Sequence, residues 1–440
     1  MNKRILRLAI PNVISNITIP LLGLISTMIA GGLGSDTAIA AVGVGASILS
    51  FIYWNCAFIR MGSSGMTAQA YGARNFGECA NILVRAMLVA LSIAALLLIF
   101  QGPVGRFGMR VMGNAEINEM VGQYFYARVW AAPATISHYA IQGWFIGMQN
   151  SRTPMVIAIS VNVFSIIFSF LFVNRFGMGV EGIAYGILVA QYLGIVLSVV
   201  LWWRFYRRFL KYIDWREAVR WKPFVKFFDV NKDIFLRTLM NNCVYTFFPF
   251  ISRQFGTTML ATNTILIQLF TLFSYIQDSF GYAAEALVGR FIGAKNYSSL
   301  RGSILRMFQW SGGLAVVFVG IFAIFWKPII AFFGASPSII ECAGDYIGWI
   351  IVVPLAGFAP FLMDGIFIGA TQTRILRNSM AVSVLIFFGL YFGLVGYMGA
   401  TALWLAFVVF VVSRGICQLI MSKGLKGLVW GQDRQLPTPA

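Results

Sequence analysis

The sequence predicts an all-α protein that crosses a membrane many times, because it is too apolar and too poorly charged for a water-soluble domain. Of its 440 residues, 59% are hydrophobic and 11% are charged, whereas soluble domains carry about 25% charged residues. The mean hydropathy is +0.79. Twelve spans of about 20 residues need about 240 mostly apolar positions, and the chain supplies about 260.

Twelve stretches have the length and apolar character of a membrane-spanning helix. The first six lie near 10–32, 38–59, 82–103, 122–147, 154–174 and 182–203, and the second six near 234–255, 258–284, 303–326, 342–369, 376–396 and 399–421. Helices are predicted because the stretches are continuously apolar and lack the alternation of barrel strands. We therefore expect an N-terminal lobe at 1–203, a linker at 204–232 and a C-terminal lobe at 233–440.

The placement of the basic residues predicts the orientation of the chain. Its net charge of +18 would suit a nucleic-acid partner, but nine Lys and Arg residues lie between Arg204 and Lys232, in the expected linker. Basic residues concentrate in cytoplasmic loops. Both termini and the linker are thus predicted to be cytoplasmic, and nucleic acid is excluded as a partner. The linker is also able to attract anionic lipid headgroups.

An internal duplication divides the chain into two homologous halves. Ile141–Arg152 reads IQGWFIGMQNSR and Met363–Arg374 reads MDGIFIGATQTR, at an offset of 222 in the numbering. Ala70–Asn75 (AYGARN) resembles Phe291–Asn296 (FIGAKN), at an offset of 221. Each half has six expected spans, so both halves enter the membrane from the same side. This is the plan of a parallel-repeat transporter, although a channel or a membrane enzyme can also contain repeats.

Three acids of the second half, in or at the edge of the expected spans, are the candidates for a functional role. Asp278 and Glu285 are two helical turns apart on one predicted helix and so share a face. Asn263 and Ser274 extend a polar stripe along that helix, and Asp364 lies in the tenth expected span. Ionisable residues inside a membrane usually mark transport pathways. We interpret these residues as an ion-coupling site and substrate cavity, with no metal.

A structural role for these acids remains the alternative. Glu285 is placed to cap a helix end or to pair with Arg60 of the first lobe. At an offset of 222, the duplication places Cys56 and Ser63 opposite Asp278 and Glu285, and Gln142 opposite Asp364. The first lobe therefore has no intramembrane acid at these positions. No cysteine spacing indicates a metal cluster or a disulfide framework.

Several segments resemble the multidrug and toxic compound extrusion (MATE) family, in its DinF-type branch. They include IRMGSSGMTAQAYGARN (59–75), QDSFGYAAEALVGRFIGAKN (277–296) and MDGIFIGATQTRILRNSM (363–380). The resemblance implies two six-helix lobes in a V, in the bacterial cytoplasmic membrane. It implies a monomeric secondary active antiporter that exports small organic cations against inward H⁺ or Na⁺ flow. No cofactor beyond that ion is expected, and the absence of a nucleotide-binding loop argues against drive by ATP.

The first lobe departs from the family pattern. The family usually carries an aspartate in the first helix, where PLLGLIST places Ser26 here, and Ser165 and Ser169 stand where the fifth helix often has Asn and Asp. The resemblance thus implies that the first-lobe site is lost. Coupling then rests wholly on the second lobe, or the protein is an uncoupled membrane receptor or scaffold. A flippase for lipid-linked precursors is a further alternative of similar architecture.

Overall fold

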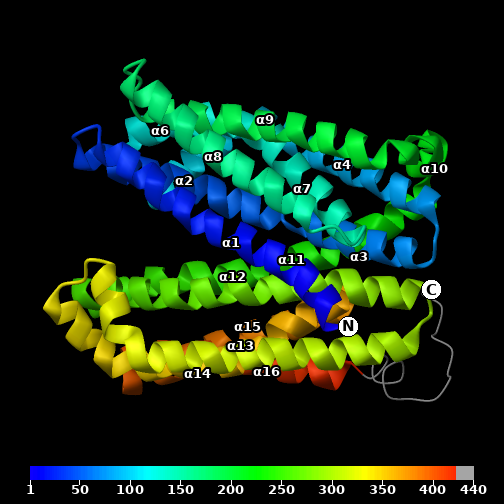
Figure 1. Cartoon of the computed structure of the whole chain (residues 1–440). Helices are drawn as coiled ribbons and strands as arrows, with labels where there is room; N and C mark the ends of the chain where they lie inside the picture. The colour runs from blue at the N-terminus through cyan, green and yellow to red at the C-terminus, as the bar shows by residue number, and fades with distance from the viewer. Residues whose placement is uncertain (423–440) are drawn as a thin grey trace. The chain divides into compact units, whose positions relative to one another are not determined.

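The computed structural model describes residues 1–422, apart from the side chains of Leu21 and Leu24, and the described chain is helical without a strand. The first half contains α1 (Asn2–Gly31), α2 (Asp36–Cys56), α3 (Phe58–Gly72), α4 (Phe76–Ile99), α5 (Gln101–Met112), α6 (Asn118–Arg128), α7 (Ala132–Gly147), α8 (Arg152–Asn174) and α9 (Val180–Tyr206). After α10 (Trp215–Ala218) follow α11 (Trp221–Ser252), α12 (Thr257–Gly293), α13 (Tyr297–Phe332), α14 (Pro337–Gly369), α15 (Thr373–Met398) and α16 (Ala400–Met421) (Figure 1). The predicted all-α fold is confirmed.

Ten helical segments of the described chain are long and apolar enough to cross a membrane. Two expected spans fall outside these ten. The fourth is divided between α6 and α7 by the short 3₁₀-helix η1 (Val129–Ala131). The seventh is the C-terminal part of α11, which carries Arg237 and the pair Asn241 and Asn242. Polar side chains and a helix break thus explain why these two differ from the rest, and the predicted total of twelve is approximate.

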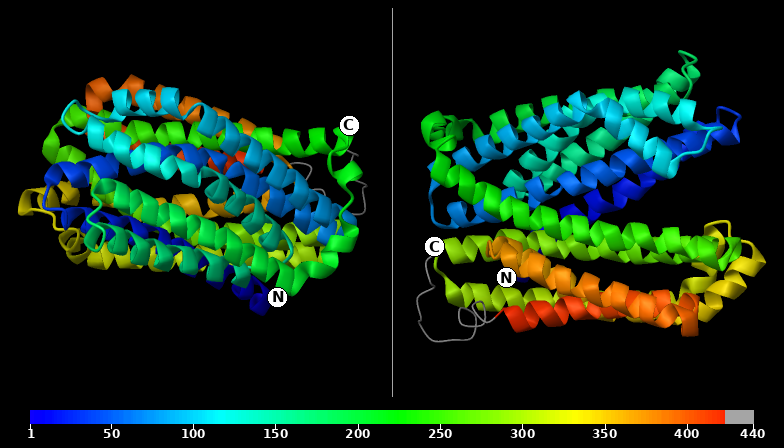
Figure 2. Two further views of the ribbon diagram at one scale, coloured as in Figure 1. Left: turned by 90° about the horizontal axis from the view of Figure 1, so that it is seen from above. Right: turned by 180° about the vertical axis from the view of Figure 1, so that it is seen from behind.

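The chain forms two compact units. One comprises Ile10–Asn231, and the other comprises Met1–Ala9 and Lys232–Ala440. We name them the first and the second unit. Residues 423–440 of the predicted C-terminal lobe lie outside the described residues. Within each unit the long helices run side by side along a common direction, as both views of Figure 2 show.

The expected linker is mostly helical and is fastened to the first unit. After α9, the chain forms a 3₁₀-helix (Arg207–Tyr212) and α10, and α11 begins at Trp221. Arg85 of α4 is fully buried and donates to the carbonyl oxygens of Ala218 at 2.9 Å and Glu217 at 3.2 Å. It also pairs with Glu78 at 2.6 Å. Arg85 therefore holds the linker against α4.

The duplication is visible in the backbone. Arg74 and Lys295, which are related by the offset of 221, are both left-handed, with φ of 57° and 53°. Gln149 and Thr371, which are related by the offset of 222, have φ of 64° and 56°. A positive φ is uncommon in residues other than glycine. These four are the only such residues in the described chain. In both halves, the same left-handed turns therefore follow the equivalent helices.

Glycines make equivalent helix contacts in the two halves. A Cβ added to Gly147 of α7 would stand 2.7 Å from the carbonyl oxygen of Ser64, and one added to Gly369 of α14 would stand 2.7 Å from that of Glu285. These glycines let α7 approach α3, and α14 approach α12, with backbone against backbone. Small residues at such contacts are typical of helix packing in membranes.

This contact corrects the predicted register of the duplication. Ser64, not Ser63, is the equivalent of Glu285, and the same offset of 221 makes Ala57, not Cys56, the equivalent of Asp278. The offset of 222 holds for α7 and α14 but not for α3 and α12. The reason is that the second half is one residue longer between these helices.

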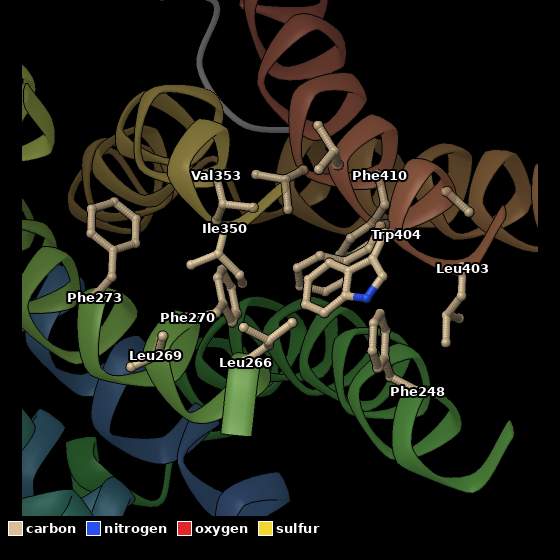
Figure 3. Packing of buried hydrophobic residues seen from close by; sticks show 14 of the residues in the cluster. Phe248, Leu266, Leu269, Phe270, Phe273, Ile350, Val353, Leu403, Trp404 and Phe410 are labelled. Atoms are coloured by element: carbon tan, nitrogen blue, oxygen red, sulfur yellow. The ribbon is translucent and has the colours of Figure 1, made fainter. Parts of the chain in front are cut away.

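Aromatic residues fill the core of the second unit. The rings of Phe248 and Trp404 lie 4.8 Å apart, and those of Phe270 and Phe407 lie 5.0 Å apart. These side chains come from α11, α12 and α16 and are all buried. Figure 3 shows Phe248, Leu266, Phe270 and Trp404 turned toward one another. Edge-to-face pairs of this kind stabilise a core beyond the area they bury.

We predict that Gly365→Ala destabilises the protein by about 1–3 kcal/mol. A methyl group there would overlap the backbone carbonyl of Gly281, which has no room to move within α12. Thermal unfolding of the purified protein in detergent measures the effect. Gly348→Ala, in the same helix, is the matched control, because a Cβ at Gly348 meets nothing within 4 Å. Equal stability of the two variants would show that the close contact is dispensable.

Candidate functional site

Asp364 is the centre of a buried charge network in the second unit. It lies on α14 and is 7% exposed. Its Oδ2 atom accepts hydrogen bonds from the Nη2 atoms of Arg237 on α11 and Arg414 on α16. Its Oδ1 atom accepts one from Nε2 of Gln418 on α16, at 2.6 Å. A single carboxylate thus ties three helices together.

The network holds two guanidinium groups against one carboxylate. Arg414 is 1% exposed and Arg237 is 8% exposed, and the guanidinium of Arg414 also lies 5.1 Å from the ring centroid of Phe361. The Nε atoms of both arginines are buried without a hydrogen-bond partner in the described part of the chain. Buried charges need partners because desolvation costs several kcal/mol per ion. Asp364 compensates only one of the two, so the trio retains a net positive charge.

Asp278 lies in the same region of the second unit. Tyr245 of α11 is within electrostatic range of Asp278, Arg237 and Arg414 together, so these charged groups lie in one region of the second unit. The side chain of Asp278 is half-buried on α12. It is therefore more accessible than Asp364.

Glu285 lies two turns further along α12 and is almost fully buried. Its backbone packs against Gly369 of α14. The groups that donate to Asp364 are Arg237, Arg414 and Gln418, and Glu285 is not bonded to it. The predicted pair between Glu285 and Arg60 joins the two units and stays a prediction. Arg60 itself is buried, on α3 of the first unit.

Asn263 and Ser274, predicted to belong to the site, make structural hydrogen bonds. Asn263 is almost fully buried. It donates from Nδ2 to Ser252 of α11 at 2.8 Å and accepts from Nε1 of Trp404 on α16 at 2.9 Å. Ser274 donates to the carbonyl oxygen of Thr271 in its own helix at 2.8 Å. Asn263 therefore ties α12 to two neighbouring helices, away from the partners of Asp364.

The three serines of the first unit differ in their surroundings. Ser26 is half-buried on α1. Ser165 is fully buried on α8, and its hydroxyl oxygen has no hydrogen-bond partner within residues 1–422. Ser169 donates to the carbonyl oxygen of Ile183 on α9 at 3.1 Å. No carboxylate stands at any of these positions.

The first unit has uncharged residues where the second has its network. Gln142 occupies the position of Asp364, at the offset of 222. Asn12 donates to Ser151 at 3.2 Å, and Asp233 accepts from Thr373 at 3.3 Å, so the same link joins α1 to α8 and α11 to α15. Equivalent residues of α1 and α11 differ by 221 in the numbering, as Asn12 and Asp233 do, which makes Asn16 the counterpart of Arg237. The duplication is thus conserved in fold and divergent in charge.

Sequence reasoning missed Arg237, Arg414 and Gln418. Both arginines lie inside expected spans, at 234–255 and 399–421. The rule that singled out the three acids applies equally to intramembrane bases, so this signal was available. It also points to Asp233, which is buried and pairs with Arg377 of α15 at 2.6 Å.

Comparisons with known proteins agree with this architecture. The MatE family model matches residues 11–171 and 234–395, one match in each unit. DNA damage-inducible protein F of Escherichia coli is 32% identical over 425 residues, which cover 94% of this chain and 90% of that protein. The probable multidrug resistance protein NorM of Neisseria meningitidis serogroup B is 22% identical over 345 residues, covering 76% of this chain and 74% of the relative.

A solved structure has the same fold. A MOP superfamily transporter from Pyrococcus furiosus superposes with a TM-score of 0.86 at 20% identity, covering 97% of this chain and 96% of that chain. The two family matches, the 32% identity across nearly the whole chain and the shared fold agree with one another. The chain belongs to the MatE family of membrane transporters, in the branch of DNA damage-inducible protein F.

Proposed function

We propose that the protein is a secondary active exporter of small organic, cationic compounds, driven by inward H⁺ or Na⁺ flow through alternating access. Membership of the MatE family supports transport, and one relative is named a multidrug resistance protein. The observation that carries the coupling proposal is the Asp364 network. It combines one buried intramembrane acid with a tie between three helices.

In this proposal Asp278 receives the coupling ion and Asp364 transmits its effect. Asp278 is half-buried, whereas both oxygens of Asp364 are held by donors from α11 and α16. An ion that neutralises Asp278 leaves the arginines without its compensating charge. The network then rearranges, and with it the contacts of α11, α14 and α16. A switch needs such a bistable element whose two states bind the ion differently.

The two buried arginines also favour a second candidate, a flippase for lipid-linked precursors. A net positive region suits an anionic cargo such as a lipid-linked phosphate. The Pyrococcus furiosus transporter is described as having a binding pocket of reverse polarity that suggests a different function. The sign of the cargo distinguishes the two candidates, and uptake assays with tetraphenylphosphonium and with a lipid-linked diphosphate would decide between them.

The location and assembly proposed are those of a bacterial cytoplasmic-membrane protein with both termini in the cytoplasm, acting as a monomer without a cofactor other than the coupling ion. The ten apolar spans support an integral membrane protein. The basic segment 204–232 supports the orientation through the positive-inside rule. The uncoupled receptor or scaffold remains the outcome if no transport is found.

Asp278→Asn and Asp364→Asn are each expected to lower ion-driven efflux of tetraphenylphosphonium from proteoliposomes at least tenfold. Asp278→Asn removes the proposed ion ligand, and Asp364→Asn removes the carboxylate that both arginines share. Efflux is measured under an imposed H⁺ gradient and then an imposed Na⁺ gradient. Asp345→Asn is the matched control, because Asp345 is an exposed acid on α14. Parental efflux in both variants would end the coupling proposal.

Asp364→Asn is expected to destabilise the protein by about 3–5 kcal/mol, since breaking a buried ion pair leaves uncompensated charge. The triple variant Asp364→Asn, Arg237→Gln and Arg414→Gln should recover part of that loss, because it removes the stranded charges. Thermal unfolding in detergent measures both, and Asp345→Asn should change stability by less than about 0.5 kcal/mol. A triple variant less stable than the single one would contradict the proposed charge balance.

Ser26→Asp tests whether the first-lobe site lacks only its acid. If so, the variant should increase the dependence of efflux on the H⁺ or Na⁺ gradient. Thr27→Asp is the control, because Thr27 is the exposed neighbour on the same helix. An unchanged gradient dependence would mean that the residues around Ser26 have also lost the ability to bind an ion.

Arg60 and Glu285 are tested by charge reversal. If they pair, exchanging both charges should restore the efflux that either single reversal abolishes. Failure of the double reversal would remove the pair from the proposed mechanism.

A further inference from the structure

A pocket of about 500 Å³ lies in the first unit, where α6 and α9 begin beside α5. Its chemistry is unlike that of the surrounding apolar surface. Its walls include two carboxylates, two amides and three aromatic rings, from Asn118, Glu119, Gln123, Tyr126, Trp130, Glu181 and Tyr185. Small-molecule sites in proteins have volumes of about 300–1,000 Å³. The pocket belongs wholly to the first unit and is separate from the Asp364 network.

The two carboxylates of the pocket have no cationic partner in the described part of the chain. Glu119 lies in the first turn of α6 and Glu181 in the first turn of α9, where the helix dipole favours an acid. Glu78 occupies a similar position on α4, but it pairs with Arg85 at 2.6 Å. The helix termini therefore explain why acids are tolerated there, but they do not explain why these two converge on one hollow.

The amide oxygen of Asn118 is buried against Gly113. Asn118 lines the pocket, and its Oδ1 atom is buried without a hydrogen-bond partner among residues 1–422. A buried carbonyl oxygen without a donor costs about 1–3 kcal/mol. The nearest bases along the chain are Arg110 of α5, Arg128 of α6 and Arg175, which follows α8, and none of them lines the pocket. Arg128 donates instead to the hydroxyl of Tyr124 at 2.5 Å. The carboxylates of Glu119 and Glu181 are thus the charged groups of its lining.

The aromatic walls are held in place by the scaffold. Trp130 lies in η1, the break between α6 and α7, and its carbonyl oxygen accepts from Tyr192 of α9 at 3.0 Å. The rings of Tyr126 and Phe125 pack edge to face at 5.3 Å. A Cβ at Gly105 of α5 would lie 3.0 Å from the Tyr126 hydroxyl, so the missing side chain makes room for this ring. The pocket is therefore preformed.

We propose that this pocket binds an organic cation of the ammonium or phosphonium type. Aromatic faces attract a cation through their quadrupoles, and the two carboxylates supply the opposite charge. This inference does not depend on transport. The same chemistry is offered by a free organic cation and by a lipid whose headgroup carries an ammonium, and aromatic residues concentrate at the ends of membrane spans where headgroups lie.

The test uses the full chain in phosphatidylglycerol nanodiscs with tetraphenylphosphonium as the probe. The protein is labelled with 5-fluorotryptophan, and the ¹⁹F resonance of Trp130, one of 12 tryptophans, is assigned from Trp130→Phe. Titration should shift this resonance to saturation. In the double variant Glu119→Gln and Glu181→Gln, at least tenfold more probe should be needed. This local readout separates the pocket from any probe bound elsewhere.

Two matched controls remove one acid each without touching the pocket. Glu341→Gln is the repeat equivalent of Glu119→Gln on α14, and Glu116→Gln removes an exposed acid one helical turn before Glu119 in the sequence. Both should titrate like the parent. The uncharged analogue triphenylphosphine oxide should shift the resonance at least tenfold less at equal concentration.

The source of the ligand is read from a second set of nanodiscs that contain phosphatidylethanolamine. If the headgroup competes, the titration midpoint rises, which assigns the pocket to a lipid. If the midpoint is unchanged, a free cation is the ligand. The proposal is overturned if Trp130 does not respond to the probe, if the double variant titrates like the parent, or if the neutral analogue binds as well as the cation.

Discussion

The need to neutralise charge inside the apolar core of the second unit is the constraint on which the rest of that unit depends. Desolvation makes an unpaired ion there very costly, and Asp364 meets the requirement by accepting hydrogen bonds from helices α11 and α16 at once. The packing of α11, α14 and α16 therefore depends on the charge state of the network. A change in charge at this point must alter the helix contacts, because a buried group that loses its partner is costly to leave unpaired.

A comparison of the two units shows that the fold does not require this charge network. Both halves use the same left-handed turns and the same glycine contacts between their helices. These features involve backbone atoms and do not depend on the side chains that face the interior. The first unit could therefore keep the architecture while carrying Asn16 and Gln142 where the second carries Arg237 and Asp364. In a duplicated fold of this kind, one half can carry a charge network at positions where the other half has uncharged residues.

The sequence predicted the fold well and the site only in part, for physical reasons. Apolar runs of span length are local patterns, so the helices and the duplication could be read directly. The partners of Asp364 are 127 and 50 residues away in the chain, and no local pattern pairs residues at such distances. The polar stripe that contains Asn263 can be read from the sequence, but its hydrogen-bond partners cannot. Only the packing of α12 against α11 and α16 shows that its amide is already satisfied by Ser252 and Trp404.

The network has two arginines and one carboxylate, and this excess of positive charge limits where a coupling ion can bind. Arg237 and Arg414 share one oxygen of Asp364, so that carboxylate has little capacity left for a further cation. A second cation placed there would have to displace a guanidinium. Asp278 is not among the groups bonded to Asp364, it is half-buried, and it lies within the electrostatic reach of the same part of α11. Neutralising it would raise the net positive charge of the region, and the region would then repel a cationic cargo. Ion entry and cargo release would thus be coupled through charge alone, without a shared ligand atom.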